Sequence, residues 1–230
     1  MKGVLVSIQP KWCQLIADKK KVVEVRKTRP KLETPFKVYI YCTKGRGDCL
    51  WEWCGHIAYD TQFPNERPNR LDGKVIGEFV CDEITEYRAE FTDLQYSDAR
   101  HKKVCQNTIK WVERDDENEE TVYRYETSNE EDDPDNCKFL KRSCLTFNEV
   151  RKYIGETFFD KPFYGWHISD LKIYDKPKGL GDFRTPCKMG DYPCCGICDY
   201  AVHGMDGDLI DCDTSLTRPP QSWCYVEVER

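Results

Sequence analysis

The chain has 230 residues, of which 39% are hydrophobic and 13% aromatic, so it can bury the core of one substantial domain or two small ones. It contains no run of about 18 apolar residues, which excludes a membrane-spanning helix. The amino-terminal sequence MKGVLVSIQPKW lacks the length and the cleavage site of a signal peptide, so we expect a soluble, cytoplasmic protein.

The net charge of −6 conceals two oppositely charged segments. Residues 113–136 hold twelve acidic residues and two arginines, a net charge of −10, whereas residues 11–37 hold nine Lys and Arg and three acidic residues, a net charge of +6. A solvated surface is the usual role of such segments. The acidic segment predicts an exposed, partly disordered insertion with TVYRYE as a strand or hairpin inside it. An alternative hypothesis is that this acidic segment captures a protein partner by mimicking nucleic acid.

The first elements along the chain alternate between strand and helix patterns. Residues 3–8 are β-branched and alternating, which predicts a strand, and residues 9–20 predict a short helix with Pro10 in its first turn. Residues 22–30 return to a period of two, and residues 36–44 form another strand pattern. The expected order is therefore strand, helix, strand, strand.

The middle and later elements are mostly strands. Residues 45–73 are rich in Gly, Asn, Pro and Arg and predict a loop. Residues 74–88 predict a long strand with a kink at Gly77, and Cys81 within it is expected to be a buried, apolar residue. Residues 165–177 predict a last core strand.

Residues 144–156 predict a helix capped by Thr146 or Asn148. Several short strands with two helices indicate an α+β domain whose strands curl into a small barrel. We expect this domain to span residues 1–177, with the acidic segment as an insertion. Residues 178–230 are expected to form a Cys-rich appendage that ends in a return strand.

The sequence ADKKKVVEVRK, residues 17–27, contains Lys21, Glu24 and Arg26 in the pattern K-x-x-E-x-R. Glu24 and Arg26 lie two apart on a predicted strand and project from one face, and Lys21 can reach that face from the preceding turn. Two cations can hold a phosphate, and the carboxylate can accept from the amino group of a base. A ladder of solvated surface ion pairs is the alternative.

This motif resembles the G-x-K-x-x-E-x-R signature of the ASCH domain, a branch of the PUA-like superfamily. Lys21, Glu24 and Arg26 match three of its four fixed positions, and Lys19 stands where the family has Gly. The sequences SIQPKWCQLI, VIGEFVCDEI and GWHISDLKIYDKP resemble other core elements of the family, and RPPQSWCYVE resembles the ending of a subgroup from phage and anaerobic bacteria. The resemblance covers roughly residues 3–175 outside the insertion and implies a PUA-like β-barrel with flanking helices.

The resemblance implies a domain that binds RNA or a nucleotide in a cationic cleft formed by Lys21, Glu24 and Arg26. Trp12, like Trp166, can stack on a base beside such a cleft, and a place in the core is the alternative for both rings.

An enzyme is the alternative function. Some small family members hydrolyse N4-acetylcytidine with the Lys and a Thr at the position of Glu24, so a hydrolase acting on a modified nucleoside, or a ribonuclease, would use Lys21 and Glu24 as catalytic residues. A carboxylate departs from that hydrolase pattern, although it can serve as a general base.

Fourteen cysteines without an export signal, several of them clustered, favour metal binding over disulfides. Cys195 and Cys198 form a C-x-x-C knuckle, with Cys187 before it and Cys212 after it. Four thiolates predict a closed, structural zinc site that stabilises the appendage. A redox C-x-x-C pair and metal-free thiols are the alternatives. The reserve ligands are His203 and Cys224.

Overall fold

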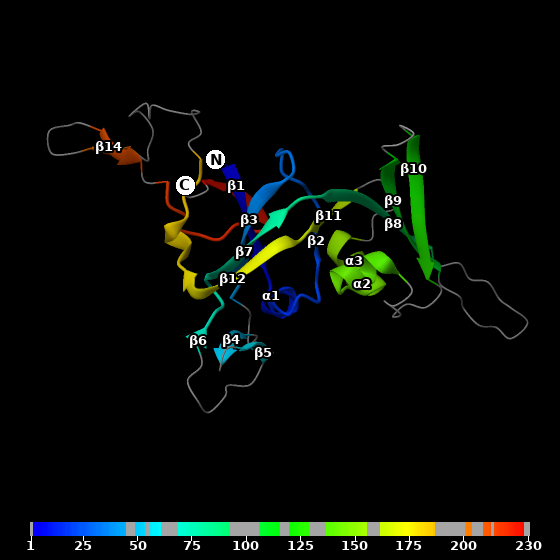
Figure 1. Cartoon of the computed structure of the whole chain (residues 1–230), viewed down its shortest axis with the longest axis horizontal. Helices are drawn as coiled ribbons and strands as arrows, with labels where there is room; N and C mark the ends of the chain where they lie inside the picture. Colours follow the sequence, from blue (N-terminus) through cyan, green and yellow to red (C-terminus); the bar gives the residue numbers. More distant parts are fainter. Residues whose placement is uncertain are drawn as a thin grey trace, which may run out of the picture. The chain divides into compact units, whose positions relative to one another are not determined.

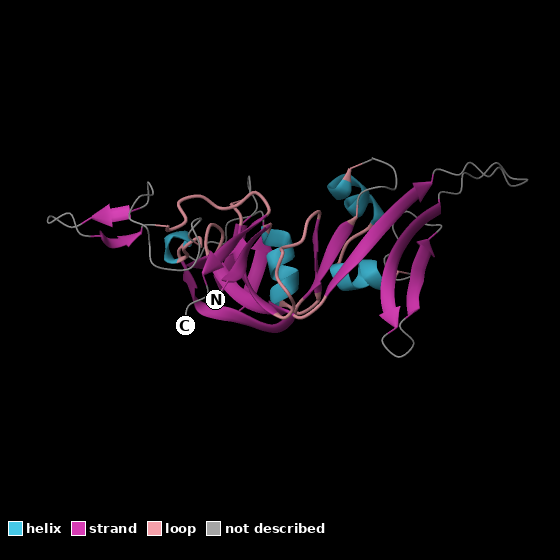
Figure 2. Cartoon of the chain, turned by 90° about the horizontal axis from the view of Figure 1, so that it is seen from above, coloured by secondary structure: helices cyan, strands magenta, loops and turns pink. Residues whose placement is uncertain are grey.

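The computed structural model describes residues 2–44, 49–53, 56–60, 69–92, 106–115, 120–128, 137–155, 162–186, 201–203, 209–212 and 214–227. The chain divides into two compact units. Unit 1 comprises residues 1–17, 36–80 and 170–230, and unit 2 comprises residues 18–35 and 81–169. Both units combine β-sheets with short helices (Figures 1 and 2), so the class is α+β as predicted.

Unit 1 contains a five-stranded sheet in the order β12-β7-β3-β1-β15. Its strands are β1 (Lys2–Ile8), β3 (Phe36–Cys42), β7 (Val75–Cys81), β12 (Ser169–Lys178) and β15 (Trp223–Glu227). The first strand lies between two partners, because Val4 is opposite Val38 in the parallel pair with β3 and opposite Tyr225 in the antiparallel pair with β15. The sequence of β1 is apolar at most positions because six of its seven residues are buried.

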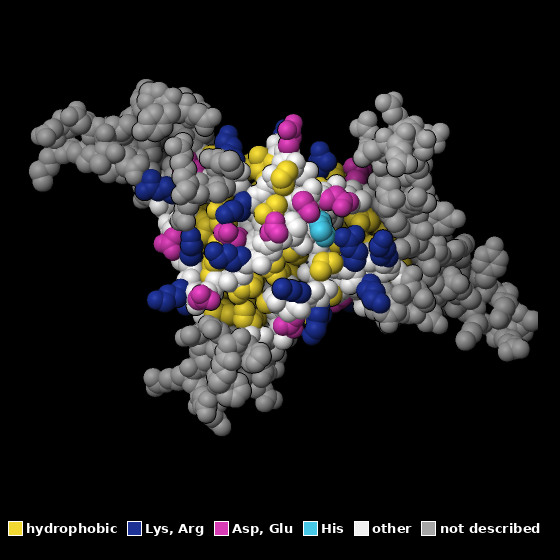
Figure 3. Space-filling model, in the orientation of Figure 1, with side chains coloured by type: hydrophobic (Ala, Val, Ile, Leu, Met, Phe, Trp, Pro, Cys, Tyr) yellow, Lys and Arg dark blue, Asp and Glu magenta, His cyan; other side chains and the backbone are white. Residues whose placement is uncertain are grey.

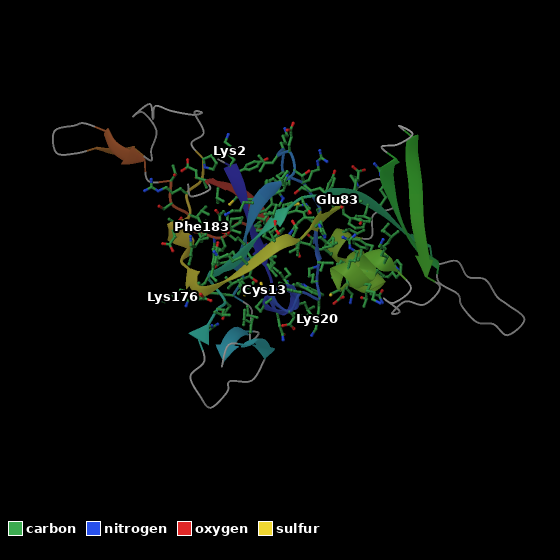
Figure 4. The ribbon with its side chains drawn as sticks, viewed as in Figure 1. Lys2, Cys13, Lys20, Glu83, Lys176 and Phe183 are labelled. Carbon is green, nitrogen blue, oxygen red and sulfur yellow. The ribbon has the colours of Figure 1, made fainter. Side chains whose placement is uncertain are left out.

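Aromatic and aliphatic side chains from distant parts of the chain form the core of unit 1 on this sheet. Phe183, labelled in Figure 4, follows the short 3-10 helix η2 (Leu180–Asp182) and packs its ring edge-on against Tyr39, with the ring centroids 4.9 Å apart. Leu5 and Val226 are fully buried in the same cluster. These contacts tie the sequence after β12 to the strands at the start of the chain.

Helix α1 (Pro10–Ala17) also belongs to unit 1 and begins at the proline that the sequence places in its first turn. It buries Pro10, Cys13 and Ile16 and ends three residues earlier than predicted. None of the helices in the described residues is long and apolar enough to cross a membrane.

The predicted loop 45–73 contains strands, which corrects that expectation. β4 (Cys49–Trp53) pairs antiparallel with β5 (His56–Asp60) and with β6 (Asn69–Arg70). Alternating aromatic residues in β4 supply the strand propensity that the Gly- and Pro-rich composition of the whole segment concealed. A two-stranded sheet of β13 (Ala201–His203) and β14 (Leu209–Cys212) lies in the Cys-rich sequence.

Unit 2 contains a second five-stranded sheet in the order β10-β9-β8-β11-β2. Its strands are β2 (Val23–Arg26), β8 (Ile84–Thr92), β9 (Gln106–Asp115), β10 (Glu120–Ser128) and β11 (Phe163–His167). The sequence TVYRYE lies in β10, which forms an antiparallel hairpin with β9, so the strand expected inside the acidic segment is confirmed. Residues 116–119 and 129–136 of that segment lie outside the described residues.

Two short helices, α2 (Lys138–Ser143) and α3 (Phe147–Ile154), lie between the β2 end and the β9–β10 end of this sheet (Figures 1 and 2). Thr146 caps α3 in a capping box with Glu149, which decides between the two predicted caps. Phe139 of α2 packs on Tyr87 of β8, with the ring centroids 4.3 Å apart. The sequence analysis did not predict α2, which is only six residues long.

Two predicted strands are each broken in two. The predicted strand 74–88 breaks at Asp82 and Glu83, not at Gly77, and Glu83 is labelled in Figure 4. Gly77 lies within β7, where an added Cβ would come 2.5 Å from the carbonyl oxygen of Lys172, so the glycine permits the close approach of β12. The predicted last strand breaks at Ile168, between β11 and β12.

The strand pairing also corrects the predicted barrel. The strands of the described residues form separate sheets, of which the two largest have five strands each, and no closed barrel joins them. The prediction overlooked the strands within residues 45–73, which form a separate three-stranded sheet, and β9, through which β10 joins the open sheet of unit 2.

Candidate functional site

The candidate site is built on β2, the edge strand of the sheet in unit 2. Backbone hydrogen bonds hold residue Val22, just before this strand, from two sides. Its N–H donates to the carbonyl oxygen of Arg142 at 2.9 Å, and its carbonyl oxygen accepts from the N–H of Ile168 at 3.0 Å. The start of β2 is therefore fixed between the end of α2 and the end of β11.

The pairing of β2 with β11 determines which residues lie beside the site. Glu24 lies opposite Trp166, and Arg26 lies opposite Tyr164. Directly opposed residues of an antiparallel pair project from the same face of the sheet. The carboxylate and the guanidinium therefore share a face with an indole ring that is 0% exposed.

Lys21, Glu24 and Arg26 come together as the motif predicts. Arg26 Nη2 lies 2.8 Å from Glu24 Oε1, and Lys21 Nζ lies 3.5 Å from Glu24 Oε2. Lys21 Nζ also donates to the carbonyl oxygen of Ser143 at 2.7 Å, which ties the lysine to the last residue of α2. We call these three charged residues the buried triad.

The burial of the triad excludes a solvated surface ladder. The residues are 3%, 6% and 6% exposed for Lys21, Glu24 and Arg26. Burial lowers the pKa of Lys21, and the positive charge of Arg26 acts in the same direction, whereas the carboxylate of Glu24 opposes the change. With all three groups ionised, two positive charges face one negative charge inside the protein, so the triad holds a net charge of +1.

Tyr153 and Lys27 lie where the triad reaches the surface. The Tyr153 hydroxyl of α3 is hydrogen-bonded to the Arg26 side chain and to the backbone of Lys27. The Lys27 ammonium lies 5.4 Å from the centroid of the same ring. Burial raises the pKa of Tyr153, although the nearby Arg26 opposes that shift. At 36% exposure, Tyr153 is the one large hydrophobic side chain among the described residues that counts as exposed.

The sequence analysis missed Tyr153 as a site residue, because it considered residues 144–156 only as a helix. No signal in the sequence links position 153 to position 26, since only tertiary contacts between α3 and β2 bring the two together.

Lys19 explains the one position at which the motif departs from the family signature. Its φ of 58° is in the left-handed region, which favours glycine. A glycine would adopt this backbone conformation without the strain that a side chain brings. The exposed Lys20, labelled in Figure 4, pairs at 3.2 Å with Asp18.

The two tryptophans proposed to stack on a base differ in burial. Trp166 is a core residue, as the alternative interpretation held. Trp12 is half-buried in α1 and lies under the ammonium of Lys11, which is 4.3 Å from the ring centroid. It belongs to unit 1, whereas the triad belongs to unit 2.

The predicted zinc ligands lie largely outside the described residues. This holds for Cys187, Cys195 and Cys198, while the backbone of Cys212 is described as the end of β14. Where side chains are described, no three His, Cys, Asp or Glu residues gather as a metal site. Burial raises the pKa of the reserve ligand Cys224 to about 11, which disfavours the thiolate form that a metal requires.

His167 at the end of β11 contacts a carboxylate that the sequence did not reveal. Its Nδ1 lies 2.7 Å from Asp82 Oδ1, in the turn between β7 and β8. Burial opposes ionisation of Asp82, but the interactions with His167, the hydrogen bond to Ser169 and a backbone hydrogen bond together outweigh it, so the pKa of this carboxyl lies below its ordinary value. Both side chains are partly exposed, which makes this a surface pair.

Unit 1 holds two other ion-paired carboxylates. Glu78 Oε1 lies 3.0 Å from Lys37 Nζ, and its Oε2 accepts from the Tyr174 hydroxyl at 2.5 Å. Asp72, whose side chain is 0% exposed, accepts two hydrogen bonds from Arg70 at 2.6 and 2.8 Å. Their cations are 36% and 49% exposed, unlike those of the buried triad.

No family model matches the sequence, and no curated protein matches it. Among solved structures, the chain is similar to the ASCH protein of Zymomonas mobilis, with a TM-score of 0.39, 13% identity, and coverage of 77% of this chain and 73% of that one. A single-residue variant of the same protein gives a TM-score of 0.42 and 12% identity over 98% of this chain and 88% of the other. The chain thus resembles solved structures of the family whose signature its motif matches, at values too low to carry any conclusion about its function.

Proposed function

We propose that this protein binds RNA or a nucleotide at the surface where the buried triad ends, with Lys27 and Tyr153 as the contact residues and Arg26 as the buried cation beside them. The observation that carries the proposal is the pair of buried cations that share the carboxylate of Glu24, together with the exposed tyrosine that lies against Arg26.

The excess charge favours an anionic ligand. A charge inside a protein has lost its hydration, so a phosphate brought next to it interacts more strongly than it would in water. The Arg26 guanidinium contacts Glu24 and the Tyr153 hydroxyl, so its positive charge lies next to the exposed ring. The exposed Lys27 adds a second cation at the same surface.

Tyr153 adds an aromatic surface for a base. Its ring lies at the protein surface and is held in place by hydrogen bonds to Arg26 and to the backbone of Lys27. A fixed ring beside cations is the combination that stacks bases of single-stranded nucleic acid.

The test measures binding of a fluorescein-labelled, single-stranded RNA of twelve nucleotides and of cytidine monophosphate. Lys27→Gln and Tyr153→Ala alter exposed side chains, so both variants are expected to fold, and Lys74→Gln in unit 1 is the matched control for lost charge. We expect Tyr153→Ala to weaken RNA binding by roughly 5- to 100-fold, equivalent to about 1–3 kcal/mol for one stacked base. Undetectable binding of both probes by the wild type, or wild-type affinity in Tyr153→Ala, would overturn the proposal.

Hydrolysis of a modified nucleoside, or of RNA, is a second candidate function, favoured by the lowered pKa of Lys21 next to Glu24. An amine with a lowered pKa is more readily deprotonated and can act as a general base. Against it stands the 3% exposure of Lys21, because a substrate atom can reach the amine only if the surrounding residues move. Binding without turnover is therefore the better-supported function.

A panel of acylated cytidines and RNA oligonucleotides tests this second candidate by product analysis. Turnover that is lost in Lys21→Met, with the variant folded by circular dichroism, would establish catalysis. Absence of product from every substrate would exclude it for the panel.

We further propose that Cys187, Cys195, Cys198 and Cys212 hold one structural zinc ion. The support is the spacing in the sequence, with two ligands from a C-x-x-C knuckle. Elemental analysis of the purified protein should give one zinc per chain, and Cys195→Ser with Cys198→Ser should lose it. A metal-free, folded wild type would contradict the assignment.

A further inference from the structure

Basic side chains gather on the helical side of unit 2, beyond the residues of the triad. Figure 3 shows Lys and Arg side chains over α2 and α3. Residues 18–31 hold seven Lys and Arg and two acidic residues, a net charge of +5, and residues 137–155 hold five Lys and Arg and one acidic residue, a net charge of +4. Two segments far apart in the sequence thus carry the same sign of charge.

Named contacts bring the two segments together at both ends of β2. At the start of the strand, the carbonyl oxygen of Arg142 accepts from Val22. At its end, Tyr153 contacts Arg26 and Lys27. The last turns of α2 and α3 therefore lie at opposite ends of this short strand.

Each of these ends carries exposed cations. Lys141 is exposed in the last turn of α2, and Lys152 is exposed in the last turn of α3, next to Tyr153. The acidic residue of α3, Glu149, is engaged by the backbone N–H of Thr146 at 3.0 Å.

The separation of the two ends sets the size of the ligand. From Val22 to Lys27 the chain advances five residues, which is about 17 Å at the usual rise of a strand. A single nucleotide is too short to contact cations at both ends, whereas several linked nucleotides can do so.

We propose that residues 18–31, α2 and α3 form one basic surface that binds the backbone of a single-stranded polynucleotide across both ends of β2. This inference rests on the proposed function, since the base-stacking Tyr153 lies at one of the two ends and the charge of the triad lies between them. RNA and single-stranded DNA share the phosphodiester and the bases that the surface recognises, so the experiment separates the two.

The experiment compares two double variants. The test variant combines Lys141→Gln with Lys152→Gln. The control variant combines Lys74→Gln with Lys176→Gln in unit 1 and loses the same charge from exposed positions. The probes are cytidine monophosphate, a twelve-nucleotide single-stranded RNA, DNA of the same sequence, and polyglutamate. Binding is measured at several salt concentrations.

We expect the twelve-nucleotide RNA to bind more tightly than the mononucleotide. The double variant in α2 and α3 should lower the slope of log affinity against log salt by about 1.4, since each lost phosphate contact on a single strand contributes about 0.7. Its affinity for cytidine monophosphate and the affinity of the control for RNA should stay unchanged. Tighter binding of RNA than of DNA would assign the 2′-hydroxyl a part in recognition, and equal binding would assign recognition to the shared backbone.

Four outcomes overturn the inference while leaving the proposed function intact. Three of them concern binding: equal affinity for the mononucleotide and the RNA, an unchanged salt slope in the α2 and α3 variant, and polyglutamate binding as tight as RNA binding. The fourth is a lower thermal midpoint in that variant with unchanged binding, because cations in a last helical turn then act only on the helix dipole. If neither nucleotide nor RNA binds the wild type, both proposals fail.

Discussion

Glu24 in unit 2 and Glu78 in unit 1 have similar partners and different surroundings. Both are on strands, and each faces a lysine, at 3.5 Å and 3.0 Å respectively. The side chains of Lys21 and Glu24 are 3% and 7% exposed, whereas those of Lys37 and Glu78 are 36% and 20% exposed. The comparison teaches that access to water, more than ion pairing itself, separates a candidate site from a structural contact.

The largest expected effect comes from removing the buried carboxylate. Glu24→Gln leaves the ammonium of Lys21 and the guanidinium of Arg26 buried without their counter-charge, so unfolding by urea should show a loss of about 3–5 kcal/mol of stability. The matched control is Glu78→Gln. A loss below about 1 kcal/mol would mean that water reaches the triad and would remove the contrast between the two units.

Asp72 is intermediate, because its own side chain is buried while its partner Arg70 is half exposed. Asp72→Asn keeps the shape but weakens two charge-assisted hydrogen bonds, and we expect a loss of about 1.5–3 kcal/mol in the same measurement. A loss as large as that of Glu24→Gln would indicate that burial of the carboxylate alone sets the cost, whatever the exposure of the cation.

Glu78→Gln should cost the least of the three carboxylate substitutions, at about 1 kcal/mol or less. The amide oxygen can still accept from the hydroxyl of Tyr174, and the exposed Lys37 regains its hydration. Adding 1 M salt should reduce the difference between Glu78→Gln and the wild type, since screening acts on exposed pairs. If this stability difference did not change with salt, the Lys37–Glu78 pair would be shielded from solvent in the way that the triad is.

The smallest effect concerns Asp82 and its dependence on pH. The pKa of Asp82 lies below its ordinary value of about 3.9, so ionised Asp82 stabilises the fold above that pH, and the contribution is lost as the pH falls through the lowered pKa. The stability difference between the wild type and Asp82→Asn should therefore stay constant down to about pH 5 and shrink below it. If the stability difference grew as the pH fell, the pKa of Asp82 would be raised by folding instead of lowered.

The sequence predicted those elements that are determined locally. The strands around β1 and β3 and the helix capped by Thr146 follow from side-chain alternation and from one hydroxyl followed by a glutamate three residues later. The grouping of Lys21, Glu24 and Arg26 was predicted too, because the three are close in sequence and two of them lie on one strand.

Features that depend on tertiary contacts could not be predicted from the sequence. The burial of the triad requires α2, a helix of six residues with no clear pattern of its own. Tyr153 and Arg26 are far apart along the chain, and the pairing of His167 with Asp82 depends on a turn that the sequence analysis treated as the interior of one strand. The open sheets depend on strand pairings that composition alone does not encode.

The pairing of β1 with β15 has a consequence for the order in which the protein forms during synthesis. Lys2 lies opposite Glu227, so β1 lacks this neighbour until residue 227 has been translated. All segments of unit 2 have been made by Ser169. At about 5–20 residues per second, the residues from there to Glu227 take roughly 3–12 s, during which this edge of β1 stays unpaired. On the ribosome, unit 2 can thus become complete before β15 covers the edge of β1.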